Sequence, residues 1–217
     1  MVSKLALFPL QSVVFPGENL PLHIYEDRYR QLIDDCEATG FTFGIPAYID
    51  NHMEFGTEVE LTGIVKSYES GAKDVICKGL RVFRIKRFYQ TDYDRVYANG
   101  DVEFLENIDD GEDTQREQLV ALIAELYQHL DVPPPKINAA TVNSYTLSHK
   151  MGLSVDQEYT LLKLNSEKDR LSFLLNHLCI TIPIVQELNR TRFTIEMNGH
   201  FRNFDPLDFE DFRLSER

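Results

Sequence analysis

The spacing of apolar positions in the first forty-five residues predicts two strands and a helix in close succession. Residues 5–10 form a short apolar run, interrupted by Pro9, that predicts the first strand. The dipeptide Pro16-Gly17 predicts a turn, because proline presets φ at about −65° and glycine accepts positive φ. Apolar side chains then occupy every second position, at Leu20, Leu22 and Ile24. This alternation predicts a half-buried strand, and its internal proline places it at a sheet edge.

The next positions change to the period of an amphipathic helix. Four side chains follow the i, i+3, i+4, i+7 spacing that places them on one stripe, at Tyr29, Leu32, Ile33 and Cys36. Gly40 stands where such a helix would end, because glycine accepts the left-handed conformation that closes many helices. The pattern therefore predicts a helix with one buried face.

Residues 41–105 predict a mainly β segment. Apolar side chains keep a period of two at Val59, Leu61 and Val65. Residues 69–73 have the composition of a hairpin loop, and residues 75–89 are rich in β-branched and aromatic side chains. Gly79 inside that last run predicts a bulge or a close backbone approach.

Helical patterns dominate beyond an acidic segment at residues 101–117, which we take as the boundary between two units. Thr114 and Glu117 form a capping-box pattern ahead of an apolar stripe, and three prolines at residues 133–135 end this helix. Residues 138–151 predict a further helix with a weaker pattern.

Two more cap patterns open the remaining helices. Ser154 with Gln157 precedes a short helix, and Ser166 with Asp169 precedes the longest one. The longest helix carries apolar residues with three-and-four spacing, at Leu171, Leu174, Leu175, Leu178, Ile182, Val185 and Leu188. Pro183 lies within it and is expected to kink or break it, since proline removes a backbone donor.

The composition indicates a globular protein with an acidic surface. Among 217 residues, 22 Lys and Arg oppose 35 Asp and Glu, so the formal net charge is −13. This charge disfavours nucleic acid as a partner. We interpret the basic stretch at residues 81–87 as an exposed strand face, with an anion-binding or acidic-partner surface as the alternative.

The three cysteines predict neither a disulfide framework nor a metal site, but reduced thiols in or near the core. No signal peptide or 18-residue apolar run is recognised, so we expect a cytoplasmic protein that does not enter a membrane.

The opening string also resembles a known family. FPLQSVVFPGENLPLHIYEDRYRQLIDDC, followed by FGI, is similar to the start of the Lon protease N-terminal domain, the substrate-recognition module. The motifs that carry this resemblance are Phe8-Pro9-Leu10, Phe15-Pro16-Gly17, Leu20-Pro21-Leu22-His23-Ile24, and Glu26 with Arg28-Tyr29-Arg30. The likeness continues more loosely to about residue 105 and returns at residues 153–178.

The resemblance implies an α+β fold. A PUA-like β-barrel subdomain would occupy residues 1–108, and a helical bundle with a long helix would occupy residues 112–200. Residues 201–217 form a tail in which phenylalanines are interleaved with acidic side chains. We expect this tail either to pack on the domain or to dock on a partner.

The chemistry of ATP-dependent Lon enzymes is missing from the sequence. No G-x-x-x-x-G-K-[ST] string occurs, so a Walker A phosphate loop cannot form, and no serine stands in a recognisable nucleophile motif. The histidines include no HExxH and no pair at i, i+4, so neither a metal nor a cofactor is expected. His23 is interpreted as a structural hydrogen-bonding residue, and Glu26 and Arg28 as an ion pair or cap. We therefore expect a stand-alone recognition module that is not an enzyme.

The resemblance implies that the protein binds polypeptide in protein quality control. The partner would be an exposed segment of an unfolded or tagged client, or another protein. Such binding needs an apolar groove. The candidate lining residues are Tyr25, Phe41, Phe43 and Tyr48, and the alternative for each of them is a place in the core. Two other hypotheses remain open, a small hydrolase with an unrecognised site and a PUA-like RNA binder.

Overall fold

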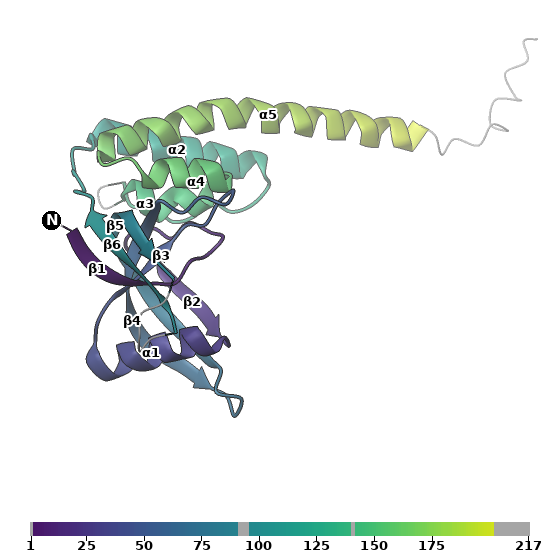
Figure 1. The fold of residues 1–217 in the computed structure, drawn as a ribbon. Helices are drawn as coiled ribbons and strands as arrows, with labels where there is room; N and C mark the ends of the chain where they lie inside the picture. Colours follow the sequence, from purple (N-terminus) through teal and green to yellow (C-terminus); the bar gives the residue numbers. More distant parts are fainter. Residues whose placement is uncertain (1, 91–95, 140–141, 202–217) are drawn as a thin grey trace, which may run out of the picture.

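The computed structural model describes residues 2–90, 96–139 and 142–201, and it confirms the predicted α+β architecture. Figure 1 shows a β-barrel with a helix packed across its lower end and a helical unit above it. The last helix extends far beyond the helical unit. Residues 202–217 of the predicted tail lie outside the described residues.

The barrel is built from six strands: β1 (Val2–Leu7), β2 (Asn19–Ile24), β3 (Phe43–Pro46), β4 (Phe55–Ser67), β5 (Lys73–Tyr89) and β6 (Ala98–Phe104). They follow the order β2-β5-β4-β3-β1-β6, and β6 also pairs with β5, which closes the sheet. The β1–β3 pair is parallel, and the other strand pairs are antiparallel. β2 pairs with the first part of β5 and stands at the end of the strand order, which confirms the edge position predicted from Pro21.

The long strand β5 organises the barrel because it pairs with β2, β4 and β6. A Cβ built on Gly79 would lie 2.2 Å from the carbonyl oxygen of Phe15, so only glycine fits this position. The close backbone approach predicted at Gly79 is therefore confirmed. The predicted hairpin loop is confirmed as well, between the end of β4 at Ser67 and the start of β5 at Lys73.

The period of two predicted for β4 is wrong at its far end. Val59 is fully buried, but Val65 is 66% exposed. The pairing of β4 with β5 shifts register between Leu61 and Gly63 and again between Ile64 and Lys66. Each shift adds a residue to one strand and changes which face the following side chains occupy.

Helix α1 (Asp27–Thr39) covers one face of the barrel. All four residues of the predicted stripe are buried, and they pack with strand residues that include Phe43, Val59, Val75 and Cys77. Gly40 ends the helix in the left-handed region at φ 73°, as predicted. Burial of Cys36 and Cys77 in this core raises the pKa of each thiol to about 12, so both stay protonated at neutral pH. Cys179, in contrast, is exposed.

The helical unit contains α2 (Asp113–His129), α3 (Ser144–Leu147), the 3-10 turn η1 (Ser148–Lys150), α4 (Val155–Leu162) and α5 (Glu167–Phe201). Its core joins apolar side chains of α2, α4 and α5, including Leu119, Ile123, Leu161, Leu171 and Leu174. The Ser154–Gln157 capping box is confirmed. The predicted box at Thr114 and Glu117 is wrong by two residues, because Glu112 and Gln115 form it instead. The helix predicted over residues 138–151 is also shorter than expected, with helical turns at residues 144–150.

Of the predicted kink or break at Pro183, the break does not occur, because helix α5 continues through this residue. Ile182 beside the proline is buried in the helical core, and Val185 packs partly against it. These contacts stabilise the helix on both sides of the proline, although its missing N–H removes one helical hydrogen bond.

The barrel and the helical unit share packing and polar contacts. Phe15, from the loop between β1 and β2, lies in the helical core and stacks on Tyr145 with ring centroids 5.4 Å apart. His149 contacts one carboxylate from each unit, with Nδ1 2.7 Å from Glu158 and Nε2 3.2 Å from Glu18. The boundary predicted near residue 110 falls between β6 and α2, and the helical core also takes in residues from before it, such as Phe15 and Val82.

A buried ion pair reinforces the helical unit. The carboxylate of Glu167 and the guanidinium of Arg170 lie 2.8 Å apart, and each side chain is 2% exposed. Glu167 accepts hydrogen bonds from the backbone N–H and the hydroxyl of Ser144. Arg170 donates to the carbonyl of Leu164 and to Asn107, which follows β6. The pair therefore ties three segments together without leaving a buried polar atom unsatisfied.

Candidate polypeptide-binding sites

The first candidate site is a groove between the segment after β1 and the chain from the end of β2 to the start of α1. We call it the Tyr25 groove. Its lining residues all belong to the motifs that open the chain: Phe8, Pro9, Leu10, Leu22, His23, Ile24, Tyr25, Glu26, Arg28 and Tyr29. The groove has a volume of about 240 Å³. Phe8 and Tyr29 close its base with ring centroids 4.0 Å apart.

Tyr25 lines this groove but leaves most of its own side chain in solvent. It follows the last residue of β2 and is 67% exposed. Its ring stacks on His23 with centroids 6.1 Å apart. His23 in turn lies 2.6 Å from the carboxylate of Asp74 on β5, which confirms a structural hydrogen-bonding role. These contacts position the Tyr25 ring on one side, and most of the ring remains exposed to solvent.

The rim of the groove carries charged side chains. Arg28 and Glu26 form the predicted ion pair at 2.7 Å, and the Arg28 guanidinium also lies 4.5 Å from the centre of the Tyr29 ring. Hydrogen bonds from His23 and Tyr68 hold the pKa of the Asp74 carboxyl below its usual range. The groove therefore combines an apolar base with charged groups of both signs at its edge.

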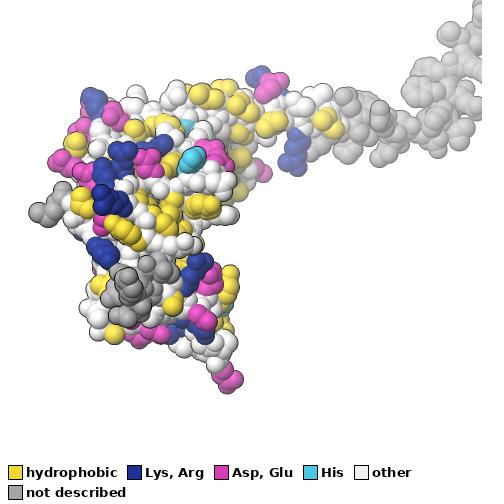
Figure 2. Space-filling model, viewed as in Figure 1, with side chains coloured by type: hydrophobic (Ala, Val, Ile, Leu, Met, Phe, Trp, Pro, Cys, Tyr) yellow, Lys and Arg dark blue, Asp and Glu magenta, His cyan; other side chains and the backbone are white. Residues whose placement is uncertain are grey.

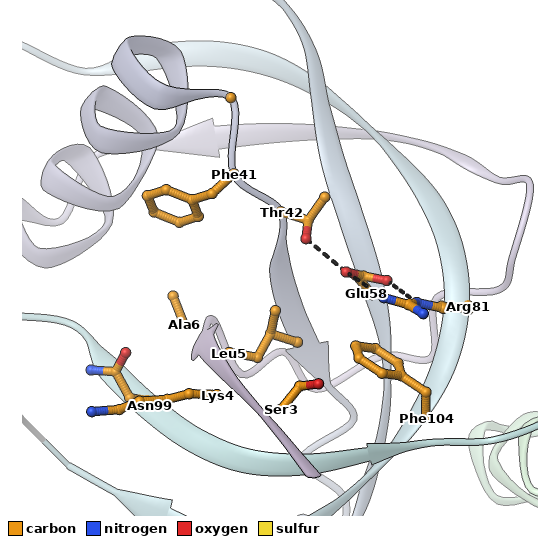
Figure 3. A pocket seen from close by; sticks show the side chains of 11 residues that line it. Ser3, Lys4, Leu5, Ala6, Phe41, Thr42, Glu58, Arg81, Asn99 and Phe104 are labelled. Atoms are coloured by element: carbon orange, nitrogen blue, oxygen red, sulfur yellow. Dashed lines mark hydrogen bonds and ion pairs between the residues drawn. The ribbon is translucent and has the colours of Figure 1, made fainter. Parts of the chain in front are cut away.

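The second candidate site is a larger cleft beside β1, which we call the barrel cleft (Figure 3). It has a volume of about 570 Å³, within the range of ligand pockets in proteins. One side is formed by residues 3–6 of β1, and the other by residues 40–42, which lead into β3. The β1–β3 pairing begins only at Ala6 and Phe43, so the cleft lies where these two segments separate.

A charged pair forms one wall of the barrel cleft. Glu58 of β4 is 4% exposed, and its carboxylate lies 2.5 Å from Nε of Arg81 on β5. Thr42 donates a hydrogen bond of 2.6 Å to the same carboxylate, as Figure 3 shows. The Arg81 guanidinium also lies 3.6 Å from the centre of the Phe104 ring, while its side chain remains 56% exposed. Two opposite contacts thus fix this guanidinium at the mouth of the cleft.

The four predicted groove residues do not form one site. Tyr25 lines the Tyr25 groove, and Tyr48 stands near it, because its backbone N–H donates to the carbonyl of the groove residue Leu10. Phe41 lines the barrel cleft instead. Phe43 is fully buried under α1 and is not available to a ligand, so its assignment to an open groove is wrong.

Sequence reasoning missed the main polar residues of the barrel cleft. Glu58 is far from Arg81 in sequence, and they meet because β4 and β5 place them opposite each other. The signal that could have suggested them is the basic stretch at residues 81–87. Among the residues that the structure describes, three of its four cations are paired, Arg81 with Glu58, Arg84 with Glu54 and Lys86 with Glu103. All four side chains lie on β5 and are exposed, which confirms the predicted exposed strand face.

The described residues also show no group of three or more His, Cys, Asp or Glu side chains that could hold a metal ion. Helix α5 contains one segment, Glu167–Arg192, that is long and apolar enough to cross a membrane by length and composition alone. Part of its apolar content is used in the helical core, through Leu171, Leu174, Leu178 and Ile182. Figure 2 shows further apolar side chains on the part of α5 that extends beyond the body.

The fold is a closed barrel joined to a helical unit, with open clefts on the barrel. Comparison with known proteins gives its family. The model of the substrate-binding domain of ATP-dependent protease La (Lon) matches residues 4–188, so the chain belongs to this family.

Two solved structures are similar to the chain. A Lon N-terminal domain protein from Xanthomonas campestris is 27% identical with a TM-score of 0.64, and the match covers 80% of this chain and 98% of that one. The N-terminal domain of a Mycobacterium avium complex Lon protease is 15% identical with a TM-score of 0.62, covering 82% and 98%. The second likeness supports the fold.

Proposed function

We propose that the protein binds segments of polypeptide through the Tyr25 groove, without catalysis. The observation that carries this proposal is the exposed Tyr25 ring beside a groove with an apolar base. Membership of a substrate-binding family supports it. A cytoplasmic location and a role in protein quality control belong to the same proposal and rest on the family alone.

The residue types in the groove suit a protein ligand. Tyrosine and arginine are enriched among the residues that dominate binding energy at interfaces, and the groove offers Tyr25, Tyr29 and Arg28. Tyr25 would bury its exposed ring against an apolar side chain of the ligand. Burial of apolar surface contributes about 25 cal/mol per Å², so a ring that buries about 60 Å² on binding would contribute about 1.5 kcal/mol to the binding free energy.

The test is a titration of a fluorescently labelled, permanently unfolded polypeptide with the protein, followed by anisotropy. Tyr25→Ala should raise the dissociation constant about tenfold, which corresponds to about 1.4 kcal/mol. The matched control is Tyr89→Ala, because Tyr89 is also a partly exposed tyrosine, 40% exposed, but does not line the groove. The control should bind as the unmodified protein does. Equal affinity of the two variants for the polypeptide would show that the Tyr25 groove is not the binding site. Absence of any polypeptide binding by the unmodified protein would refute the proposed function.

A further inference from the structure

The barrel cleft carries a second recognition chemistry that differs from that of the Tyr25 groove. We propose that it binds a carboxylate joined to an apolar group, the chemistry found at the C-terminal residue of a polypeptide. This inference rests on the proposed polypeptide-binding function, but it assigns a separate site with a different specificity. The residue that would receive the carboxylate is Arg81.

The geometry of Arg81 leaves one edge of its guanidinium for a ligand. Nε lies 2.5 Å from one carboxylate oxygen of Glu58, and Nη2 lies 3.5 Å from the other. Within the described part of the chain, Nη1 donates to no protein acceptor, although the side chain is 56% exposed. A guanidinium has five N–H donors, so an arginine whose Nε edge is held by one carboxylate can still donate end-on, through Nη1 and Nη2, to a second one.

The contacts around Arg81 preorganise it for this role. Glu58 is itself fixed by Thr42, and the flat face of the guanidinium is covered by the Phe104 ring at 3.6 Å. A long side chain that is already held loses less conformational entropy when a ligand binds. Arg81 is therefore a better anion receptor than a freely moving surface arginine.

The rest of the cleft suits the apolar part of such a ligand. Leu5, Ala6, Phe41 and Phe104 line it together with the hydroxyl groups of Ser3 and Thr42. Its volume of about 570 Å³ is larger than one side chain needs and fits a short chain end. Arg81 places a half-exposed guanidinium at the mouth of this cleft, in a chain with a net charge of −13. The cleft would thus favour an anion that most of the surface repels.

The experiment compares labelled decapeptides of one unstructured sequence ending in leucine, with a free C-terminal carboxylate or with a C-terminal amide. The free carboxylate should bind at least tenfold more tightly by anisotropy. N-acetyl-leucine, added as a competitor, distinguishes a polypeptide end from a small carboxylate. Displacement at equal concentrations would overturn the assignment to a polypeptide end, whereas displacement only at large excess supports it.

Variants then place this preference in the cleft. Arg81→Gln paired with Glu58→Gln removes the receptor without leaving a buried carboxylate alone, and it should abolish the difference between carboxylate and amide. The matched control is Arg84→Gln with Glu54→Gln, which removes an ion pair outside the cleft between β5 and the residue before β4. Its arginine is about as exposed as Arg81, and its carboxylate is more exposed than Glu58. This control should keep the full difference. Melting curves and circular dichroism confirm that both double variants fold.

The two proposals fail in different ways. Equal binding of carboxylate and amide peptides, with loss of affinity in Tyr25→Ala, would overturn the barrel-cleft site and leave the Tyr25 groove standing. A carboxylate preference that persists in the Arg81 double variant would also overturn it. Failure of both peptides and of unfolded polypeptide to bind would refute both proposals.

Discussion

The buried ion pair between Glu167 and Arg170 allows a sharp test of how the helical unit is held together. The perturbation is Arg170→Met, which keeps much of the side-chain volume and removes the guanidinium. Glu167, 2% exposed, would then be a buried carboxylate with only its Ser144 hydrogen bonds. The carbonyl of Leu164 and the side chain of Asn107 would also lose a donor.

Removing one partner of a buried ion pair costs about 3–5 kcal/mol, because the remaining charge stays desolvated. The lost bonds to Leu164 and Asn107 are part of this cost. A protein of this size loses about 2–4 °C in melting temperature per kcal/mol, so Arg170→Met should lower it by about 6–20 °C. Adding Glu167→Gln removes the uncompensated charge while keeping an acceptor for Ser144, so the double variant should regain at least half of the loss.

The assay is urea unfolding followed by circular dichroism, with scanning calorimetry as a second measure. The control is Arg190→Met on the same helix. Arg190 pairs with Glu187 at the same i, i+3 spacing, but the two side chains are 80% and 71% exposed, so its loss should cost under about 0.5 kcal/mol. A cost for Arg170→Met no greater than for this control, or a double variant less stable than the single one, would refute the reasoning.

Two further predictions concern the junction of the units and the centre of the sheet. Glu18 and then Glu158 raise the pKa of His149 to about 9, so this contact stabilises the fold fully below about pH 6.5, and the stabilisation is lost as pH rises to about 9. Because His149 is 42% exposed, the loss should be about 1 kcal/mol after screening, seen as a lower urea midpoint at pH 9.5 than at pH 6. His149→Gln should remove this difference, and an unchanged difference would contradict it. Gly79→Ala should lower the free energy of unfolding by about 1–3 kcal/mol in the same assay, because the added carbon meets the Phe15 carbonyl. The control Gly63→Ala places its added carbon with no atom within 4 Å and should leave the stability unchanged. Equal effects of the two substitutions would contradict the close approach at Gly79.

Local patterns predicted the elements whose packing follows directly from their own residues. The stripe of α1 and its end at Gly40 depend on positions within one turn or two of each other, and both are confirmed. The helix does not break at Pro183, because tertiary contacts of Ile182 and Val185 outweigh the missing hydrogen bond. Val65 was misjudged because the register shifts of β4 depend on its partner strand.

The same limit applies to the candidate sites. An exposed aromatic such as Tyr25 could be proposed from the alternation of its own strand. Phe43 could not be separated from it, because burial there depends on how α1 lies over the barrel. The pairing of Glu58 with Arg81 needs the register of two strands, which no local pattern contains.

Closure of the barrel has a consequence for how the chain folds during synthesis. β1 pairs with β6 from Val2 opposite Glu103 to Leu7 opposite Ala98. This pairing therefore cannot form until residues about one hundred positions later have been synthesised. Phe15 has a still later partner in Tyr145. Contacts this distant in sequence slow folding, because the loop entropy must be lost before they form. The hairpin of β4 and β5, whose residues are close in sequence, should therefore order first on the ribosome, and the pairing of β1 with β6 should close the barrel last.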